Sequence, residues 1–495
     1  MSFAFLGLLL LASTMPVVGE AELENGLRIL VLEDHSQPRV ACKILTRFGA
    51  VVEEPGRFGS AHFLEHLMFK GTATIGTHDW EAEKPILDEI LELERDIIQE
   101  RNRARSEMRE RGVYHDFKHA ETTPELERLM SILHEKIIED ERYVDTEESN
   151  SYYQRTGGTR LTAQTEQEYM KFDINLPSEK LEMFFRIEAD RMVNSRWRRF
   201  DSEVGILWEQ RLGDLNRADT VFKEAVASAS GVVSPIYWNE GYETDFPILE
   251  RNYTRRLYET WFVPNNTIIV LVGDTTLEEA ERLTKKYFDR IPRGEETHDT
   301  FAVEPRPDHY VRVEMQTPHF GPALDIRHRI PGVGHPDRPA VELLGEILGD
   351  PRGPIGVATL GEGLATSLAS NTVVTHTNRF SFPATLNLVA HGSNLEALEP
   401  AIIGAMENLR TERIADDVIR AAKKRRRAYW ERRRLNWDDV AFDMGHYAIM
   451  DSWQTLFREM DALQEVTAEQ LQATAKKYLA KTNRIVGVAT REPVQ

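Results

Sequence analysis

The chain has 495 residues, which is too long for one hydrophobic core and fits about two to four domains. Hydrophobic residues make up 41% and charged residues 29%, so the composition excludes a disordered or membrane-embedded protein. The net charge of −20 argues against nucleic acid and anionic membranes as partners.

The N-terminal segment 1–22 contains an apolar stretch of about ten residues. This stretch is too short to span a bilayer and is typical of the hydrophobic region of a signal peptide. We therefore predict a signal peptide over residues 1–19 and a periplasmic or secreted protein. No basic residue precedes the stretch, so a mis-assigned start, a membrane-tethered end and a cytoplasmic location stay open.

Two strands are predicted at 27–34 and 39–52, and a helix at 61–70 follows them. The only cysteine, Cys42, lies in the second strand and is expected in the core. A single cysteine excludes an internal disulfide and a cysteine-rich metal site.

Residues 81–150 are almost entirely charged and helical in pattern. Apolar residues recur at helical spacing on one face of each of two predicted helices: Ile86, Ile90, Leu93 and Ile97, then Leu126, Leu129, Leu133 and Ile137. This pattern predicts an inserted helical hairpin with solvated outer faces.

Beyond the insert, 159–177 alternates like strands, 178–212 reads as one long helical region, and 256–292 reads as helix, strand and helix. The stretch WFVPNNTIIVLV aligns without gaps on YLAKTNRIVGVA, so that Asn266 falls on Asn483, 217 residues later (483 − 266). Such a repeat indicates two halves of related fold.

We therefore predict an α+β protein with two related α/β-sandwich domains, at 20–292 and 311–495. The helical insert belongs to the first domain. The polar, proline-bearing segment 293–310 is the expected linker.

The stretch HFLEH places two histidines four residues apart on the predicted helix, so His62 and His66 lie on one face and can bind one ion. Glu65 reaches the same side. Two neutral nitrogen ligands beside a carboxylate that can take a proton from water are the elements of a hydrolytic zinc site.

The residues around this motif, 25–72, closely resemble the catalytic half of the pitrilysin/insulinase family of zinc peptidases, the inverzincins. The resemblance continues through 155–192, 200–211 and 262–274, and more faintly through 466–483. It therefore covers nearly the whole chain, and the insert resembles a long-insert bacterial branch of the family.

This resemblance implies two similar domains per chain, and two chains that close like a clamshell around an unfolded peptide. A homodimer, or a heterodimer with a sister chain, is therefore expected. It also implies one Zn²⁺ per chain, held by His62 and His66, with Glu65 as the general base. The substrate would lie as an added strand beside the strand that contains Thr162 and Ala163.

The third ligand in the family is a glutamate that lies seven residues after another acidic residue. Here Glu203 takes the earlier acidic position and is expected to support the ligands from behind, so the ligand position falls on Gln210 (203 + 7). Glu209 is the neighbour, but it lies about 120° away around the helix. A neutral amide is a poorer zinc ligand than a carboxylate. Either Gln210 binds zinc weakly, or a local helix irregularity turns Glu209 inward, or the site is compromised.

Other positions also depart from the family pattern. Thr162-Ala163 stands where Asn-Ala is usual, and an arginine–tyrosine pair typical of the second half is missing, with Thr366 at the tyrosine position. The leading hypothesis is a zinc-dependent endopeptidase of unfolded peptides or small proteins. The alternative is a weak or inactive homologue that acts as the partner subunit of an active sister chain.

Overall fold

The computed structural model describes residues 16–110, 123–145, 147–230, 241–246, 249–297, 310–317, 321–373 and 384–491. Its strands are β1 (Gly19–Glu22), β2 (Arg28–Glu33), β3 (Arg39–Thr46), β4 (Thr159–Thr165), β5 (Met170–Pro177), β6 (Thr267–Gly273), β7 (Val311–Thr317), β8 (Ala323–Arg329), β9 (Ser367–Val373), β10 (Thr385–His391) and β11 (Arg484–Arg491). The helices of the first half are α1 (Ser60–Met68), α2 (Trp80–Glu110), α3 (Pro124–Asp140), α4 (Glu148–Arg155), α5 (Leu181–Asn194), α6 (Phe200–Leu215), α7 (Ala218–Ser230), α8 (Arg251–Trp261) and α9 (Leu277–Phe288). Those of the second half are α10 (Arg338–Leu348), α11 (Pro354–Gly356), α12 (Leu395–Thr411), α13 (Asp416–Arg433), α14 (Trp437–Met450), α15 (Trp453–Glu465) and α16 (Ala468–Tyr478).

The two sheets share one topology. The first has the order β1-β2-β6-β3-β5-β4 and the second the order β7-β11-β8-β10-β9. In each sheet a parallel pair, β2 with β6 or β7 with β11, is followed by antiparallel neighbours only. The α+β fold with two related halves is therefore confirmed, and β1 is the strand that the second sheet lacks within the described residues.

Asn266 and Asn483, the equivalent asparagines in the two copies of the sequence repeat, have the same structural role. Asn266 donates hydrogen bonds from Nδ2 to the carbonyl oxygens of Arg47 (2.9 Å) and Trp261 (2.8 Å). Asn483 donates to the carbonyl oxygens of Arg329 (2.8 Å) and Tyr478 (2.7 Å). Each amide joins the end of a helix to the end of a central strand, so the same short sequence is needed twice.

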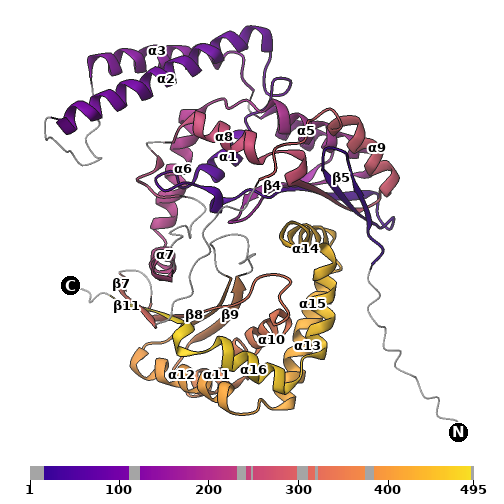
Figure 1. The fold of residues 1–495 in the computed structure, drawn as a ribbon, viewed down its shortest axis with the longest axis vertical. Coiled ribbons are helices and arrows are strands. Elements are labelled where there is room, and N and C mark those ends of the chain that lie inside the picture. Colours follow the sequence, from indigo (N-terminus) through magenta and orange to yellow (C-terminus); the bar gives the residue numbers. More distant parts are fainter. Residues whose placement is uncertain are drawn as a thin grey trace.

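Each sheet has helices of its own half on one face and a helix of the other half on the opposite face (Figure 1). Helices α1, α5, α8 and α9 cover one face of the first sheet, and α14, from the second half, covers the other. Reciprocally, α7 packs through Phe222 and Val226 on the second sheet, whose other face carries α10, α12 and α16. The two halves are thus joined by an exchange of helices.

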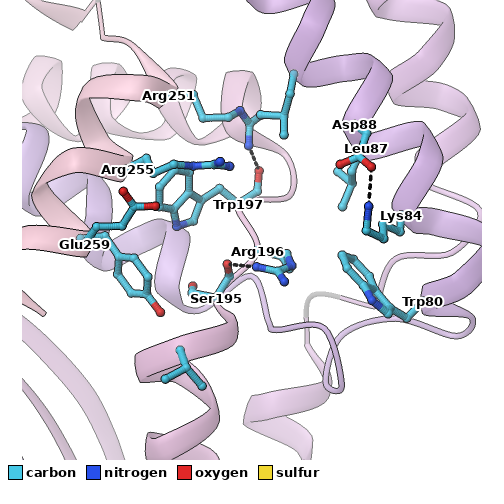
Figure 2. Close-up of a pocket in the computed structure, with 13 residues that line it drawn as sticks. Trp80, Lys84, Leu87, Asp88, Ser195, Arg196, Trp197, Arg251, Arg255 and Glu259 are labelled. Carbon is cyan, nitrogen blue, oxygen red and sulfur yellow. Dashed lines mark hydrogen bonds and ion pairs between the residues drawn. The ribbon is translucent and has the colours of Figure 1, made fainter. Parts of the chain in front are cut away.

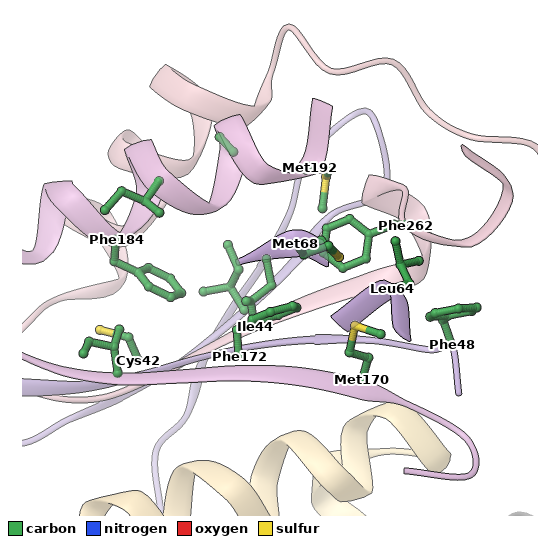
Figure 3. Close-up of a cluster of buried hydrophobic side chains, with 14 of the residues drawn as sticks. Cys42, Ile44, Phe48, Leu64, Met68, Met170, Phe172, Phe184, Met192 and Phe262 are labelled. Carbon is green, nitrogen blue, oxygen red and sulfur yellow. The ribbon is translucent and has the colours of Figure 1, made fainter. Parts of the chain in front are cut away.

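The first core lies between the sheet and α1, α5 and α8 (Figure 3). Cys42 is 1% exposed within it, as its place in an alternating strand predicts. The predicted single helical region over 178–212 is wrong in one respect, because α5 and α6 are separate helices. Ser195 forms a bridge with Thr72, and Arg199 has a left-handed φ of 54°, so the chain leaves the helix between them.

The inserted hairpin is present, with α2 and α3 packed against each other and projecting from the first half (Figure 1). The apolar residues expected at their contact form a separate small core, with Leu93 and Ile137 only partly buried. Most of the predicted signal peptide (1–15) and of the predicted linker (298–309) lies outside the described residues. Among the residues that the structure describes, no helix has the length and apolarity needed to cross a membrane.

Candidate metal centre

Helix α1 carries the HFLEH motif and begins at a defined cap. Gly59 has a φ of +90°, which favours glycine, and the chain turns into the helix there. The buried Glu53 carboxylate accepts hydrogen bonds from the backbone N–H groups of Gly59 (2.9 Å) and Ala61 (2.6 Å). These hydrogen bonds satisfy two backbone N–H groups at the start of the helix, directly before His62.

The two histidines of α1 converge on one point. Their Nε2 atoms lie 3.2 Å apart, and their rings are nearly perpendicular, at 87°. Nδ1 of His62 is buried and has no hydrogen-bond partner among the described residues. Burial, together with the neighbouring His66, lowers the pKa of His62 to about 3, so this imidazole is neutral near pH 7. Two neutral ring nitrogens that face each other are suited to hold a metal ion.

Glu203 lies behind His66, as its sequence position predicts. Its Oε2 is 3.2 Å from Nδ1 of His66, and its Oε1 is 2.7 Å from Nζ of Lys70. Burial raises the pKa of Glu203, but the bonds from His66 and Lys70 outweigh it and hold that pKa below the usual range. A carboxylate on Nδ1 keeps the proton on that nitrogen and leaves the Nε2 lone pair free for a metal.

Glu65 lies beside the histidines with its carboxylate buried. Thr165, the last residue of β4, donates a hydrogen bond from Oγ1 to Oε2 of Glu65 (2.7 Å). Burial raises the pKa of Glu65, and the hydrogen bond from Thr165 and the charges of His66 and Lys171 partly offset that rise. A carboxyl group with a raised pKa is suited to take up and release a proton near neutral pH.

The expected third ligand does not join this group. Helix α6 is continuous over 200–215, so Gln210 lies within about 20° of Glu203 around the helix. Gln210 and Glu209 are both exposed, and neither forms a hydrogen bond to His62 or His66 in the described part of the chain. Among the described residues no cluster of three or more histidine, cysteine, aspartate or glutamate side chains could hold a metal ion. The residues present fit zinc through the two histidines, and the third donor stays a prediction.

The strand expected to receive substrate leads to this group. Within the described residues β4 pairs only with β5, so its other edge is unpaired. Thr162 is exposed and Ala163 half-buried on that strand, and Thr165 at its end contacts Glu65. Two contacts of this group, those of Lys70 and Thr165, are not predicted from the sequence. Lys70, four residues after His66, could have been found from helical spacing, but Thr165 could not, because its place depends on strand register.

The second half retains part of this arrangement. Thr165 of β4 and Thr372 of β9 occupy matching positions in the two sheets. The match follows from the strand pairing in each sheet, counted outward from Asn266 and Asn483. Thr372 donates to Oε1 of Glu342 on α10 (2.9 Å), just as Thr165 donates to Glu65 on α1. Glu342 is held by two arginines, Arg338 (2.5 Å) and Arg426 (2.8 Å). Helix α10 has no histidine, so the histidine pair of α1 has no counterpart on this helix.

Models of one peptidase family match two parts of the chain. Residues 28–83, which contain α1, match the family model described as Insulinase (Peptidase family M16). Residues 249–426 match the model described as Peptidase M16 inactive domain. The chain belongs to the pitrilysin/insulinase family.

Relatives of this family match along nearly the whole chain. The zinc protease PqqE of Helicobacter pylori is 21% identical over 484 residues, which cover 95% of this chain and 92% of the relative. The pitrilysin/insulinase fold is shared with the crystal structure of a protease from Helicobacter pylori (TM-score 0.76, 17% identity, 96% of this chain and 100% of that one). It is also shared with a peptidase M16 inactive domain from Pseudomonas fluorescens (TM-score 0.73, 14% identity, 97% and 99%). The periplasmic protease PqqL from Escherichia coli matches with a TM-score of 0.69 at 13% identity, over 96% of this chain and 47% of that one.

Proposed function

We propose that this chain is a zinc-dependent endopeptidase that hydrolyses unfolded peptides or small proteins. The observation that carries the proposal is the convergence of the His62 and His66 Nε2 atoms, 3.2 Å apart, beside the buried carboxylate of Glu65. One zinc ion per chain, when bound, would polarise a peptide carbonyl and lower the pKa of water.

The residues of the chain then have separate roles. His62 and His66 hold the ion, with Gln210, or Glu209 if the register differs, as the third donor. Glu203 orients His66 and keeps its proton on Nδ1. Glu65 takes a proton from the attacking water and passes it to the leaving amine.

The substrate would bind as an added strand along the free edge of β4, beside Thr162 and Ala163. Backbone hydrogen bonds at a sheet edge give affinity without strict sequence demand, which suits an unfolded peptide. Thr165 joins this edge to Glu65, so a peptide on β4 would lie next to the proton acceptor.

Glu65→Gln tests the proposal. The variant should bind as much zinc as the natural chain, because Glu65 is not a ligand, yet it should lose hydrolysis of a quenched fluorescent peptide. His62→Ala and His66→Ala should instead lose the metal, as measured by atomic absorption. Loss of zinc in Glu65→Gln would show that Glu65 is structural and would contradict its role as a base.

The second candidate is a catalytically weak or inactive partner subunit of an active sister chain. The exposed neutral Gln210 at the third-ligand position favours it, since a site with two histidines and an amide should hold zinc weakly. The purified chain would then contain little zinc and cleave peptides only when it is mixed with the sister chain. Stoichiometric zinc and cleavage by the chain alone would exclude this candidate.

We also propose that the chain acts as a dimer, with itself or with a sister chain, because it matches about half the length of the protease PqqL. The interface should bury more than about 1,000 Å². A fully active monomer in sedimentation at micromolar concentration would contradict this.

A periplasmic or secreted location is proposed from the apolar N-terminal stretch and the likeness to the periplasmic protease PqqL. Fractionation of cells that express the full chain tests it. Recovery in the cytoplasm alone would refute it.

A further inference from the structure

A pocket of about 340 Å³ lies where the inserted hairpin meets the body of the first half (Figure 2). Trp80, Lys84 and Leu87 of α2 form one side of it. The other side consists of Val193 at the end of α5, of Ser195, Arg196 and Trp197 between α5 and α6, and of residues of α8. The pocket is separate from the candidate metal centre, because neither histidine nor Glu65 lines it.

Two arginines line this pocket without a carboxylate partner in the described part of the chain. Arg196 lies between the two sides, 5.0 Å from the ring centre of Trp80, and donates only to the carbonyl oxygen of Ser195 (3.2 Å). Arg255 lies 5.5 Å from the ring centre of Trp197. Burial lowers the pKa of the Arg196 guanidinium, and the positive charges of Arg198 and Arg255 act in the same direction. Within the described residues, neither guanidinium forms an ion pair with a carboxylate, and both bring positive charge to the pocket.

The other basic groups of the pocket are already paired. Lys84 lies 2.5 Å from Asp88, and Arg251 lies 2.6 Å from Glu94. One further carboxylate, that of Glu259, lines the pocket on the exposed side of α8. Unlike Lys84 and Arg251, Arg196 and Arg255 form no ion pair among the described residues, so both can bind a ligand.

Two buried hydrogen-bond donors of the same pocket also lack partners. Nε1 of Trp197 and Oγ of Ser195 are inaccessible to solvent and form no hydrogen bond within the described residues. The two residues are only 6% and 7% exposed. A buried polar group without a partner is costly. Both of these groups belong to residues that line the pocket, next to the two arginines.

We propose that this pocket binds a small organic anion, in which a carboxylate or phosphate group is attached to an apolar body. Arg196 and Arg255 supply the charge and donate hydrogen bonds to the anionic oxygens, and the bound anion lies against the wall that contains Trp197 and Ser195. Leu87, Leu91 and Val193 form the apolar wall that receives the rest of the molecule. The bound anion ties α2 of the hairpin to the segment that leads into α6.

Calorimetric titration of the full chain tests this with matched probes: hexanoate, phenyl phosphate, inorganic phosphate, 1-hexanol and hexylamine. Hexanoate or phenyl phosphate should bind once per chain and at least about tenfold more tightly than the alcohol, the amine or inorganic phosphate. The preferred organic anion identifies the head group as carboxylate or phosphate. Quenching of Trp80 and Trp197 fluorescence should follow the same titration.

Variants decide whether binding occurs in this pocket. Arg255→Gln, at an exposed position that tolerates the change, should weaken anion binding about tenfold or more, and Arg196→Gln should do the same. Arg256→Gln is the matched control, because Arg256 is exposed on the same helix but does not line the pocket. Glu259→Gln should leave binding intact or tighten it. No binding of either organic anion, equal binding of 1-hexanol, or unchanged affinity in Arg255→Gln would overturn the proposal.

Discussion

Replacement of Glu203 by glutamine tests how the buried carboxylate behind His66 acts. Its two oxygens contact His66 Nδ1 (3.2 Å) and Lys70 Nζ (2.7 Å), and the residue is only 3% exposed. Glutamine keeps the size but loses the negative charge, so His66 becomes a weaker donor to the metal. Loss of such a supporting partner weakens metal binding by about 10- to 100-fold, or about 1.4–2.7 kcal/mol. Competition with a fluorescent zinc chelator measures this change directly.

The same variant has a separate effect on folding that must be measured without metal. The ion pair with Lys70 becomes a hydrogen bond between the charged lysine and a neutral amide, which should lower the free energy of unfolding by about 1–3 kcal/mol. Urea unfolding of the metal-free chain measures it. Glu209→Gln is the control, because Glu209 is exposed on the same helix without a partner in the described residues and should change unfolding by less than about 0.5 kcal/mol. Unchanged zinc affinity in a folded Glu203→Gln would refute the role assigned to this carboxylate.

Two further predictions concern the third ligand and the pH dependence of stability. Gln210→Glu should raise zinc affinity and peptidase rate, because a carboxylate adds charge and a better oxygen donor, whereas Glu209→Gln should leave both unchanged. A Glu209→Gln variant that loses its zinc, with no gain in Gln210→Glu, would show that Glu209 is the ligand. Burial and the charges of Arg484 and Arg410 lower the pKa of His328 to about 3, so the unfolded chain takes up a proton that the folded chain refuses between about pH 6.5 and pH 3. The neutral histidine contributes its full stability above pH 6.5, and this contribution should fall by about 1.4 kcal/mol per pH unit below it. Urea unfolding at several pH values from 7 to 4 measures the free energy of unfolding. In His328→Gln this free energy should fall with pH less steeply by that amount. An equal slope in both proteins would contradict the assignment.

The local parts of the candidate site could be predicted from the sequence. The spacing of His62, Glu65 and His66 on a helix depends only on the 3.6-residue turn, and the structure places all three on one side of α1. The family pattern places Glu203 near the ligands, and only the structure shows that its carboxylate lies against His66. No spacing of this kind could show that Gln210 and Glu209 would both be exposed, because the distance between α6 and α1 is set by the packing of the whole half.

What the sequence by itself determined is therefore periodic and local: the strands, the helical faces of the hairpin, the histidine motif and the repeat marked by Asn266 and Asn483. The tertiary structure alone decided that Thr165, 100 residues from Glu65, would hold its carboxylate. It also decided that α14 and α7 would each cover the sheet of the other half, and that Arg196 and Trp197 would face α2 across a pocket. The physical reason is that hydrophobic burial is non-directional. A sequence shows which face of an element is apolar, but the partner that covers this face, and the register at which it does so, depend on contacts between residues far apart in the chain.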